Sequence, residues 1–219
     1  MLESMSTSSS TSSLRSRAAA GCPDALQSGM GVSPRLIYVM GPSGCGKDSL
    51  LRYARERLAG DAAVVFAHRY ITRAAAAGGE NHVELTPAEF STRLRNSLFA
   101  LTWESHGHAY GVGIEIDQWL SRGATVVVNG SREYLAEAKR RYPDLLAVAI
   151  EAPAEMLLAR LLARGREDHA AIQSRLDRHR AMPGTAPDGA VIANDGLLEL
   201  AGEALVALVR SHAGPALCA

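Results

Sequence analysis

The sequence has no excess of charge of either sign, and aromatic residues are scarce. Lys and Arg total 23 and Asp and Glu total 23 among the 219 residues, so the formal net charge is zero. A neutral chain is poorly suited to coating nucleic acid or to binding an acidic membrane through a polybasic patch. Aromatic residues make up 5% of the chain, which disfavours a surface on which bases stack. No run of about 18 or more apolar residues is present, so no transmembrane helix is indicated.

Cysteine is also rare, with only Cys22, Cys45 and Cys218 in the chain. An odd number of cysteines at wide spacing forms neither a disulfide framework nor a metal-ligand pattern. Such usage suits a reducing compartment, and we therefore expect a cytoplasmic protein. The length suits one domain that carries at most a small insertion.

The first 33 residues differ in composition from the rest. Ser and Thr dominate the beginning and no apolar periodicity is visible, so we expect residues 1–33 to form a disordered tail. A transit peptide is the alternative, although Glu3 and Asp24 are acidic. Met30 is an alternative start, because the organised part begins directly after it. We expect the folded domain over 34–212 and a short C-terminal tail over 213–219.

From Arg35 onward, short apolar runs alternate with segments of helical periodicity. Fully apolar strands separated by helices predict an α/β fold, with a parallel sheet covered by helices on both faces. The predicted strands are 35–40, 62–67, 125–129, 145–150 and 190–193, and the predicted helices are 48–58, 154–163 and 197–209. A segment rich in Gly, His and polar residues, about 73–113, breaks this rhythm and is where we expect a substrate-binding insertion.

The strongest motif, GPSGCGKDS, lies between the first predicted strand and the first predicted helix. Its glycines allow successive backbone N–H groups to surround a phosphate, and the helix N-terminus adds its positive dipole end. Lys47 supplies a mobile positive charge for the β- and γ-phosphates of ATP. This strand–loop–helix order predicts a P-loop. The residues expected to hold the nucleotide are Gly41, Pro42, Ser43, Gly44, Cys45, Gly46, Lys47, Asp48 and Ser49.

The residue after the lysine departs from the usual P-loop pattern. Ser or Thr usually stands there and binds Mg²⁺, whereas this chain has Asp48 followed by Ser49. A carboxylate is a good ligand for Mg²⁺, so we expect Asp48 to bind the metal directly or through water. The alternative is that Asp48 only favours the helix N-terminus electrostatically. Asn129 ends a strand where many P-loop proteins carry an acid directed at the metal, which shifts that role toward Asp48 or water.

With this loop placed, residues 35–211 resemble the guanylate kinase family. The resemblance implies a guanylate kinase-like core with an acceptor-binding insertion and a lid over about 160–182. It also implies that Arg164 and Arg175 of the lid neutralise charge on the transferred phosphoryl group, and that Asn194 lies on the adenine side. The segments that carry the resemblance are the phosphate loop, Thr72-Arg73, Gly79-Glu80, Tyr110-Gly111, the run from Arg160 to Leu176, and Asn194-Asp195.

The sequence departs from that family at the positions that recognise the guanine base. The glutamate expected nine residues before Tyr110 is Leu101, the aspartate expected at a strand end is Ser131, and the second phosphate arginine is Ala76. A guanine pocket needs acceptors for the ring N–H and amino groups, and leaving them unpaired destroys selection. We therefore expect an acceptor that carries phosphates rather than a base.

A narrower resemblance agrees with this expectation. The strings AHRYITR, YGVGIEID, VVVNGSR and NDG are similar to those of the ribose 1,5-bisphosphate phosphokinases of bacterial phosphonate degradation. The resemblance implies transfer of the γ-phosphoryl group of ATP, with Mg²⁺, to the 1-phosphate of ribose 1,5-bisphosphate, giving 5-phosphoribosyl diphosphate (PRPP). The residues expected to hold the acceptor are Arg69, Arg73, His82, Tyr110 and Arg132.

Two other functions stay open at this point: a guanylate or other nucleoside monophosphate kinase with a rebuilt pocket, and an inactive guanylate kinase-like interaction module. Lys47 and the lid arginines argue against the module. For Glu115 and Asp117, a role in the site and a role at a helix N-terminus are equally open. The oligomeric state is also open, with a homodimer as one alternative. We expect no nucleic-acid or membrane partner.

Overall fold

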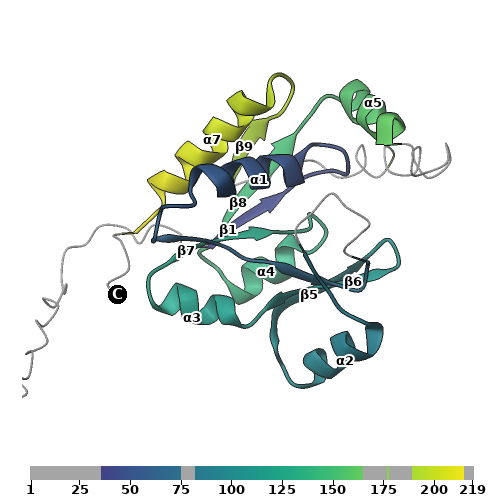
Figure 1. Cartoon of the computed structure of the whole chain (residues 1–219), viewed down its shortest axis with the longest axis vertical. Coiled ribbons are helices and arrows are strands. Elements are labelled where there is room, and N and C mark those ends of the chain that lie inside the picture. Colours follow the sequence, from purple (N-terminus) through teal and green to yellow (C-terminus); the bar gives the residue numbers. More distant parts are fainter. Residues whose placement is uncertain (1–35, 75–81, 165–176, 178–188, 215–219) are drawn as a thin grey trace, which may run out of the picture. The chain divides into compact units, whose positions relative to one another are not determined.

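Strand β1 (Leu36–Met40) lies in the middle of a five-stranded parallel sheet (Figure 1). The computed structural model describes residues 36–74, 82–164, 177 and 189–214. The order across the sheet is β2-β7-β1-β8-β9. The other strands are β2 (Val64–Phe66), β7 (Thr125–Asn129), β8 (Leu146–Glu151) and β9 (Ala190–Ala193). Each of the five strands predicted from the sequence is a strand of this sheet, and every pairing in it is parallel.

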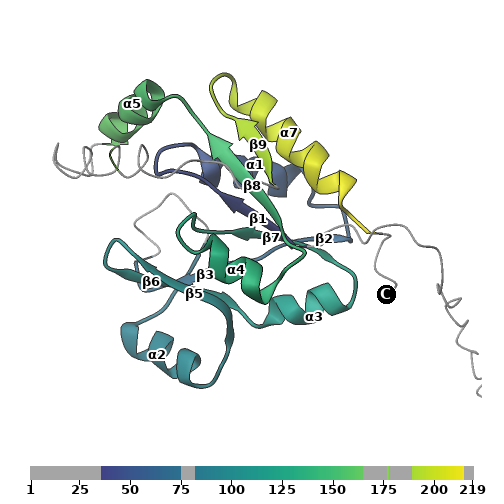
Figure 2. The ribbon, with the colours of Figure 1, turned by 180° about the vertical axis from the view of Figure 1, so that it is seen from behind.

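Alternate residues of β1 face two different hydrophobic layers, which is why this strand is apolar throughout. Ile37 and Val39 pack in a cluster with α1 (Lys47–Arg57), α5 (Ala154–Arg164) and α7 (Leu198–Ser211). Leu36, Tyr38 and Met40 pack in a second cluster on the opposite face, with α3 (Glu115–Ser121) and α4 (Leu135–Arg141). Figure 2 shows these two helical layers from behind.

A second sheet of four strands, in the order β4-β3-β6-β5, occupies the predicted insertion. It begins before the expected boundary, because β3 is formed by Arg69–Ile71. Strands β5 and β6 form an antiparallel hairpin whose turn, His106-Gly107, has φ values of 50° and 74°. The remaining elements are β4 (His82–Glu84), α2 (Pro87–Arg95), β5 (Phe99–Ser105) and β6 (His108–Gly113).

The second sheet joins the main domain through a shared core. Ala100 and Leu101 of β5 and Val112 of β6 belong to the same hydrophobic cluster as Tyr38 and Met40 of β1. The sheet is therefore held against the face of the parallel sheet that α3 and α4 also cover. A smaller cluster of Leu85, Phe90 and Phe99 fixes α2.

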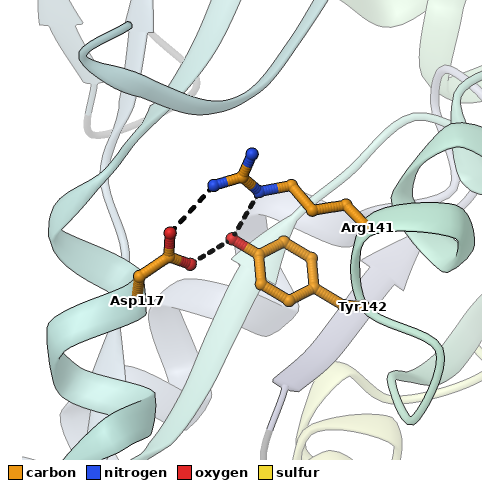
Figure 3. Close-up of polar contacts among 3 residues, drawn as sticks. All are labelled: Asp117, Arg141 and Tyr142. Carbon is orange, nitrogen blue, oxygen red and sulfur yellow. Dashed lines mark hydrogen bonds and ion pairs between the residues drawn. The ribbon is translucent and has the colours of Figure 1, made fainter.

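A polar cluster connects α3 to α4 (Figure 3). Asp117 of α3 accepts a hydrogen bond of 2.8 Å from Arg141 Nη2 and one of 2.5 Å from the Tyr142 hydroxyl, and Arg141 Nε donates to that hydroxyl at 3.1 Å. Burial, followed by the hydrogen bond to Asp117, raises the pKa of Tyr142 to about 12. Asp117 thus connects two helices.

Several predicted features fall outside the described residues: the tail over 1–33, most of the lid, Arg175, and the end of the C-terminal tail. Within the described residues, no helix is both long and apolar enough to cross a membrane.

Candidate active site

The phosphate loop connects β1 to α1, in the order that the sequence predicts. Gly44 and Gly46 have φ values of 88° and 86°, a region that side chains rarely adopt, so glycine is required at both positions. The Cys45 N–H donates to the Pro42 carbonyl at 3.2 Å, which closes the turn. Helix α1 then begins at Lys47, so its N-terminal N–H groups adjoin the loop.

Lys47, Asp48 and Asn129 form a hydrogen-bonded network at the start of α1. Lys47 Nζ donates to Asn129 Oδ1, and Asn129 Nδ2 donates to Asp48 Oδ1 at 3.0 Å. Lys47 Nζ also lies 3.6 Å from Asp48 Oδ1. The structure thereby brings together the P-loop lysine, the predicted metal ligand, and the residue that ends β7.

The donor set at this point fits a magnesium–nucleotide complex. Mg²⁺ prefers oxygen ligands and is usually bound through one or two carboxylates, with phosphates and water completing its shell. Asp48 supplies one carboxylate beside the phosphate-loop lysine, Lys47. Among the described residues, no three or more His, Cys, Asp or Glu side chains gather into a group that could hold a metal ion.

Two residues outside the phosphate loop donate hydrogen bonds to the carbonyl of Cys45. Asn194, which follows β9 and is 2% exposed, donates through Nδ2 at 2.7 Å. Arg160 of α5 donates to the same carbonyl at 3.3 Å and to the Asn194 carbonyl at 3.3 Å. Asn194 therefore braces the loop in this structure. The bracing role of Arg160 was not predicted, although the residue stands in the lid pattern.

The Cys45 side chain itself points into the core. It is buried among the residues beneath α1, and burial raises the pKa of its thiol. A buried neutral thiol is a poor nucleophile, so this cysteine serves the loop as a small apolar side chain.

Arg69 lies over an aromatic platform in the second sheet. Its guanidinium carbon is 5.2 Å from the ring centre of Tyr110 and 5.9 Å from that of Trp103. The two rings are cross-strand partners, stacked at 5.5 Å with an interplanar angle of 5°. Arg69 is only 9% exposed, so the platform fixes a largely buried cation. The sequence suggested Arg69 and Tyr110 as site residues, and Trp103 was not among them.

His82 supports the backbone of Arg73. The His82 ring is 8% exposed and its Nε2 lies 3.0 Å from the Arg73 carbonyl oxygen. On the other side, His108 Nδ1 lies 2.9 Å from the Thr72 carbonyl, and Thr72 Oγ1 accepts from the Ala109 N–H at 2.9 Å. Both histidines therefore contact backbone carbonyls of the Thr72-Arg73 segment.

Tyr38 fixes the loop that follows β7. Its hydroxyl donates to the Ser131 carbonyl at 2.9 Å and accepts from the Ser131 N–H at 2.8 Å. Burial raises the pKa of Tyr38, so the hydroxyl stays protonated. Arg132 follows Ser131 directly in this loop. Tyr134, at the end of the same loop, lies against Trp103 of the second sheet with ring centres 5.8 Å apart.

For the remaining predicted residues, the structure gives fewer contacts. Arg164 ends α5, and Arg175 lies outside the described residues. Glu115 contacts the second sheet, because the Tyr70 hydroxyl of β3 donates to its Oε1 at 3.4 Å. His106 is exposed in the hairpin turn.

Comparison with known proteins gives two kinds of match. The ribose 1,5-bisphosphate phosphokinase PhnN of Thiobacillus denitrificans is 57% identical over 177 residues, covering 80% of this chain and 92% of that protein. The PhnN protein of Desulfomicrobium baculatum is 57% identical over 175 residues, covering 80% and 94%. A crystal structure of guanylate kinase from Anaplasma phagocytophilum superposes with a TM-score of 0.59 at 17% identity, covering 84% of this chain and 88% of that one. No protein-family model matches the chain.

The parallel sheet and the phosphate loop define a guanylate kinase-like P-loop fold. Within that class, the chain belongs to the PhnN family of ribose 1,5-bisphosphate phosphokinases.

Proposed function

We propose that this kinase transfers the γ-phosphoryl group of ATP to the 1-phosphate of ribose 1,5-bisphosphate, forming PRPP. Family membership supports the reaction. The acceptor assignment rests on one combination: a complete phosphate loop, and a second sheet that holds Arg69 on two aromatic rings and supports the backbone of Arg73. We expect the protein to act in the cytoplasm, as a source of PRPP during phosphonate degradation.

In the donor half, Lys47 and the N-terminus of α1 would bind the β- and γ-phosphates. Asp48 is the carboxylate suited to hold Mg²⁺, which when bound neutralises charge on the phosphates. Asn194 and Arg160 would keep the loop rigid through the Cys45 carbonyl. Arg164 and Arg175 are proposed to reach the transferred phosphoryl group from the lid.

In the acceptor half, Arg69, Arg73 and Arg132 would bind the two phosphates of the sugar. A guanidinium binds a phosphate with two parallel hydrogen bonds, which fixes orientation as well as charge. The platform of Trp103 and Tyr110 holds Arg69, and His82 supports Arg73. A phosphate acceptor is already anionic, so the reaction needs positioning and charge neutralisation rather than a general base.

Two positions argue against guanine as the acceptor. Leu101 is 1% exposed within the core and offers no hydrogen-bond acceptor where the guanylate kinase family has glutamate. At Ser131, both backbone groups are bonded to Tyr38 and the side chain carries no charge. A guanine bound here would lose its water partners without gaining carboxylate ones.

The direct test is to incubate the protein with ATP, Mg²⁺ and ribose 1,5-bisphosphate and to follow the products by ³¹P NMR. The proposal predicts a second pair of coupled diphosphate resonances beside those of ADP. The Lys47→Ala variant, confirmed as folded by its melting curve, is the control and should give neither pair. Formation of ADP without a second diphosphate product would contradict the proposal.

A further inference from the structure

Asn129 joins the two charged residues at the start of α1. Its Oδ1 accepts a hydrogen bond from Lys47, and its Nδ2 donates one to Asp48 Oδ1 at 3.0 Å. Lys47 lies 3.6 Å from the same carboxylate oxygen, so the three side chains close a ring. Asn129 reaches this position as the last residue of β7, where it pairs with Val39 of the strand that leads into the phosphate loop.

An amide suits this position because it accepts and donates at the same time. An aspartate at position 129 could accept from Lys47 but would offer no hydrogen to Asp48. Two carboxylate oxygens would then face each other across a distance of 3.0 Å. The network therefore requires one carboxylate and one amide, and either of the two positions could hold either group.

Many P-loop enzymes hold Mg²⁺ with a loop hydroxyl after the lysine and an acid at the end of a neighbouring strand. In this chain the acid stands after the lysine and the strand end carries an amide. We propose that Asp48 and Asn129 are a matched pair in which the metal-facing carboxylate has moved from the strand to the helix. Asn129 is the positioning residue that holds Asp48 and Lys47. The inference rests on the proposed nucleotide site but not on the identity of the acceptor.

The pair is tested by nucleotide binding in the absence of any acceptor. Isothermal titration calorimetry gives the Kd of the β,γ-imido analogue of ATP in EDTA and in Mg²⁺, and the ratio of the two values is the metal coupling. The variants are Asp48→Asn, Asn129→Ala and the exchanged pair Asp48→Asn/Asn129→Asp. Asn96→Ala, an exposed amide at the end of α2, is the matched control.

The metal coupling should fall about 10-fold or more in Asp48→Asn, and about 5-fold in Asn129→Ala although the carboxylate is kept. The exchanged pair should restore it to within about 3-fold of the wild type, because the ring again holds one carboxylate and one amide. A structural role alone would lower the melting temperature of Asn129→Ala and leave the coupling unchanged, which would overturn the proposal.

An exchanged pair that folds but couples to Mg²⁺ no better than Asp48→Asn would also overturn it. Melting curves identify any variant that does not fold. The comparison of Asn129→Ala with the wild type and that of the exchanged pair with Asp48→Asn each test the proposal independently. Because no acceptor is present, these results are independent of the experiment on ribose 1,5-bisphosphate. The wild-type coupling is measured in the same series and shows whether the nucleotide site itself is correct.

Discussion

At the scale of single residues, Arg73 is the arginine that the guanylate kinase resemblance assigns to the acceptor phosphate, and the structure supports its backbone through His82. Lysine in its place would keep the charge but lose the paired hydrogen bonds. We expect Arg73→Lys to raise the KM for ribose 1,5-bisphosphate or to lower kcat, with the KM for ATP almost unchanged. Arg95→Lys on the exposed side of α2 is the control. A defect confined to ATP would place Arg73 in the donor half instead.

Trp103 contacts Arg69 and Tyr110, and the sequence did not predict these contacts. Replacing it with leucine keeps an apolar side chain in β5 but removes one ring of the platform under Arg69. We expect Trp103→Leu to raise the acceptor KM several-fold, because a looser guanidinium binds phosphate less well. Trp119→Leu removes a tryptophan from the same hydrophobic cluster and is the matched control. Equal effects of both variants on the acceptor KM would show that the platform has no specific role.

At the scale of elements, β1 and the loop after β7 are connected by one hydroxyl. Tyr38→Phe keeps the ring but leaves both backbone groups of Ser131 without this partner, which should cost about 1–3 kcal/mol of stability. Because Arg132 follows Ser131, the acceptor KM should rise as well. Tyr53→Phe removes the hydroxyl that bonds Glu203 on the other face and should leave the acceptor KM unchanged. An unaltered acceptor KM in Tyr38→Phe would show that the loop is fixed by other contacts.

The cluster that joins α3 to α4 predicts a pH dependence (Figure 3). The pKa of Tyr142 is raised to about 12, so its contribution to stability is complete below the pKa of a free tyrosine, near 10, and is lost as the pH rises toward 12. We expect the difference in melting temperature between the wild type and Tyr142→Phe to be constant from about pH 7 to 9 and to shrink above about pH 10. A difference that grows with pH would contradict the raised pKa.

At the scale of the whole molecule, the sequence was sufficient for the parallel sheet and the phosphate loop. The apolar runs of β1, β7 and β8 give the clearest signal, since these three strands are buried on both faces. The second sheet could not be predicted in detail, because β3 and β4 are three residues long and carry polar side chains. Strand β3 pairs with β6 of the β5–β6 hairpin, and β4 pairs with β3, so these short strands depend on contacts between distant residues.

The phosphate loop could be located because its residues are neighbours in the chain, whereas contacts between residues that are distant in the chain could not be predicted. The platform depends on the register that pairs Trp103 with Tyr110, which the turn at His106-Gly107 sets. The contact between Tyr38 and Ser131 joins residues 93 positions apart, and that between Asn129 and Lys47 joins residues 82 apart. No local pattern in the sequence predicts such contacts. They follow from the strand order of the folded sheet.

This guanylate kinase-like fold phosphorylates a sugar bisphosphate rather than a nucleotide. The most direct test is to measure kcat/KM for ribose 1,5-bisphosphate and for guanosine monophosphate at the same ATP and Mg²⁺ concentrations. The arginines proposed to bind the acceptor, and the lack of carboxylates at Leu101 and Ser131, predict a preference for the sugar of at least about 100-fold. A ratio near one, or a preference for guanosine monophosphate, would contradict the account.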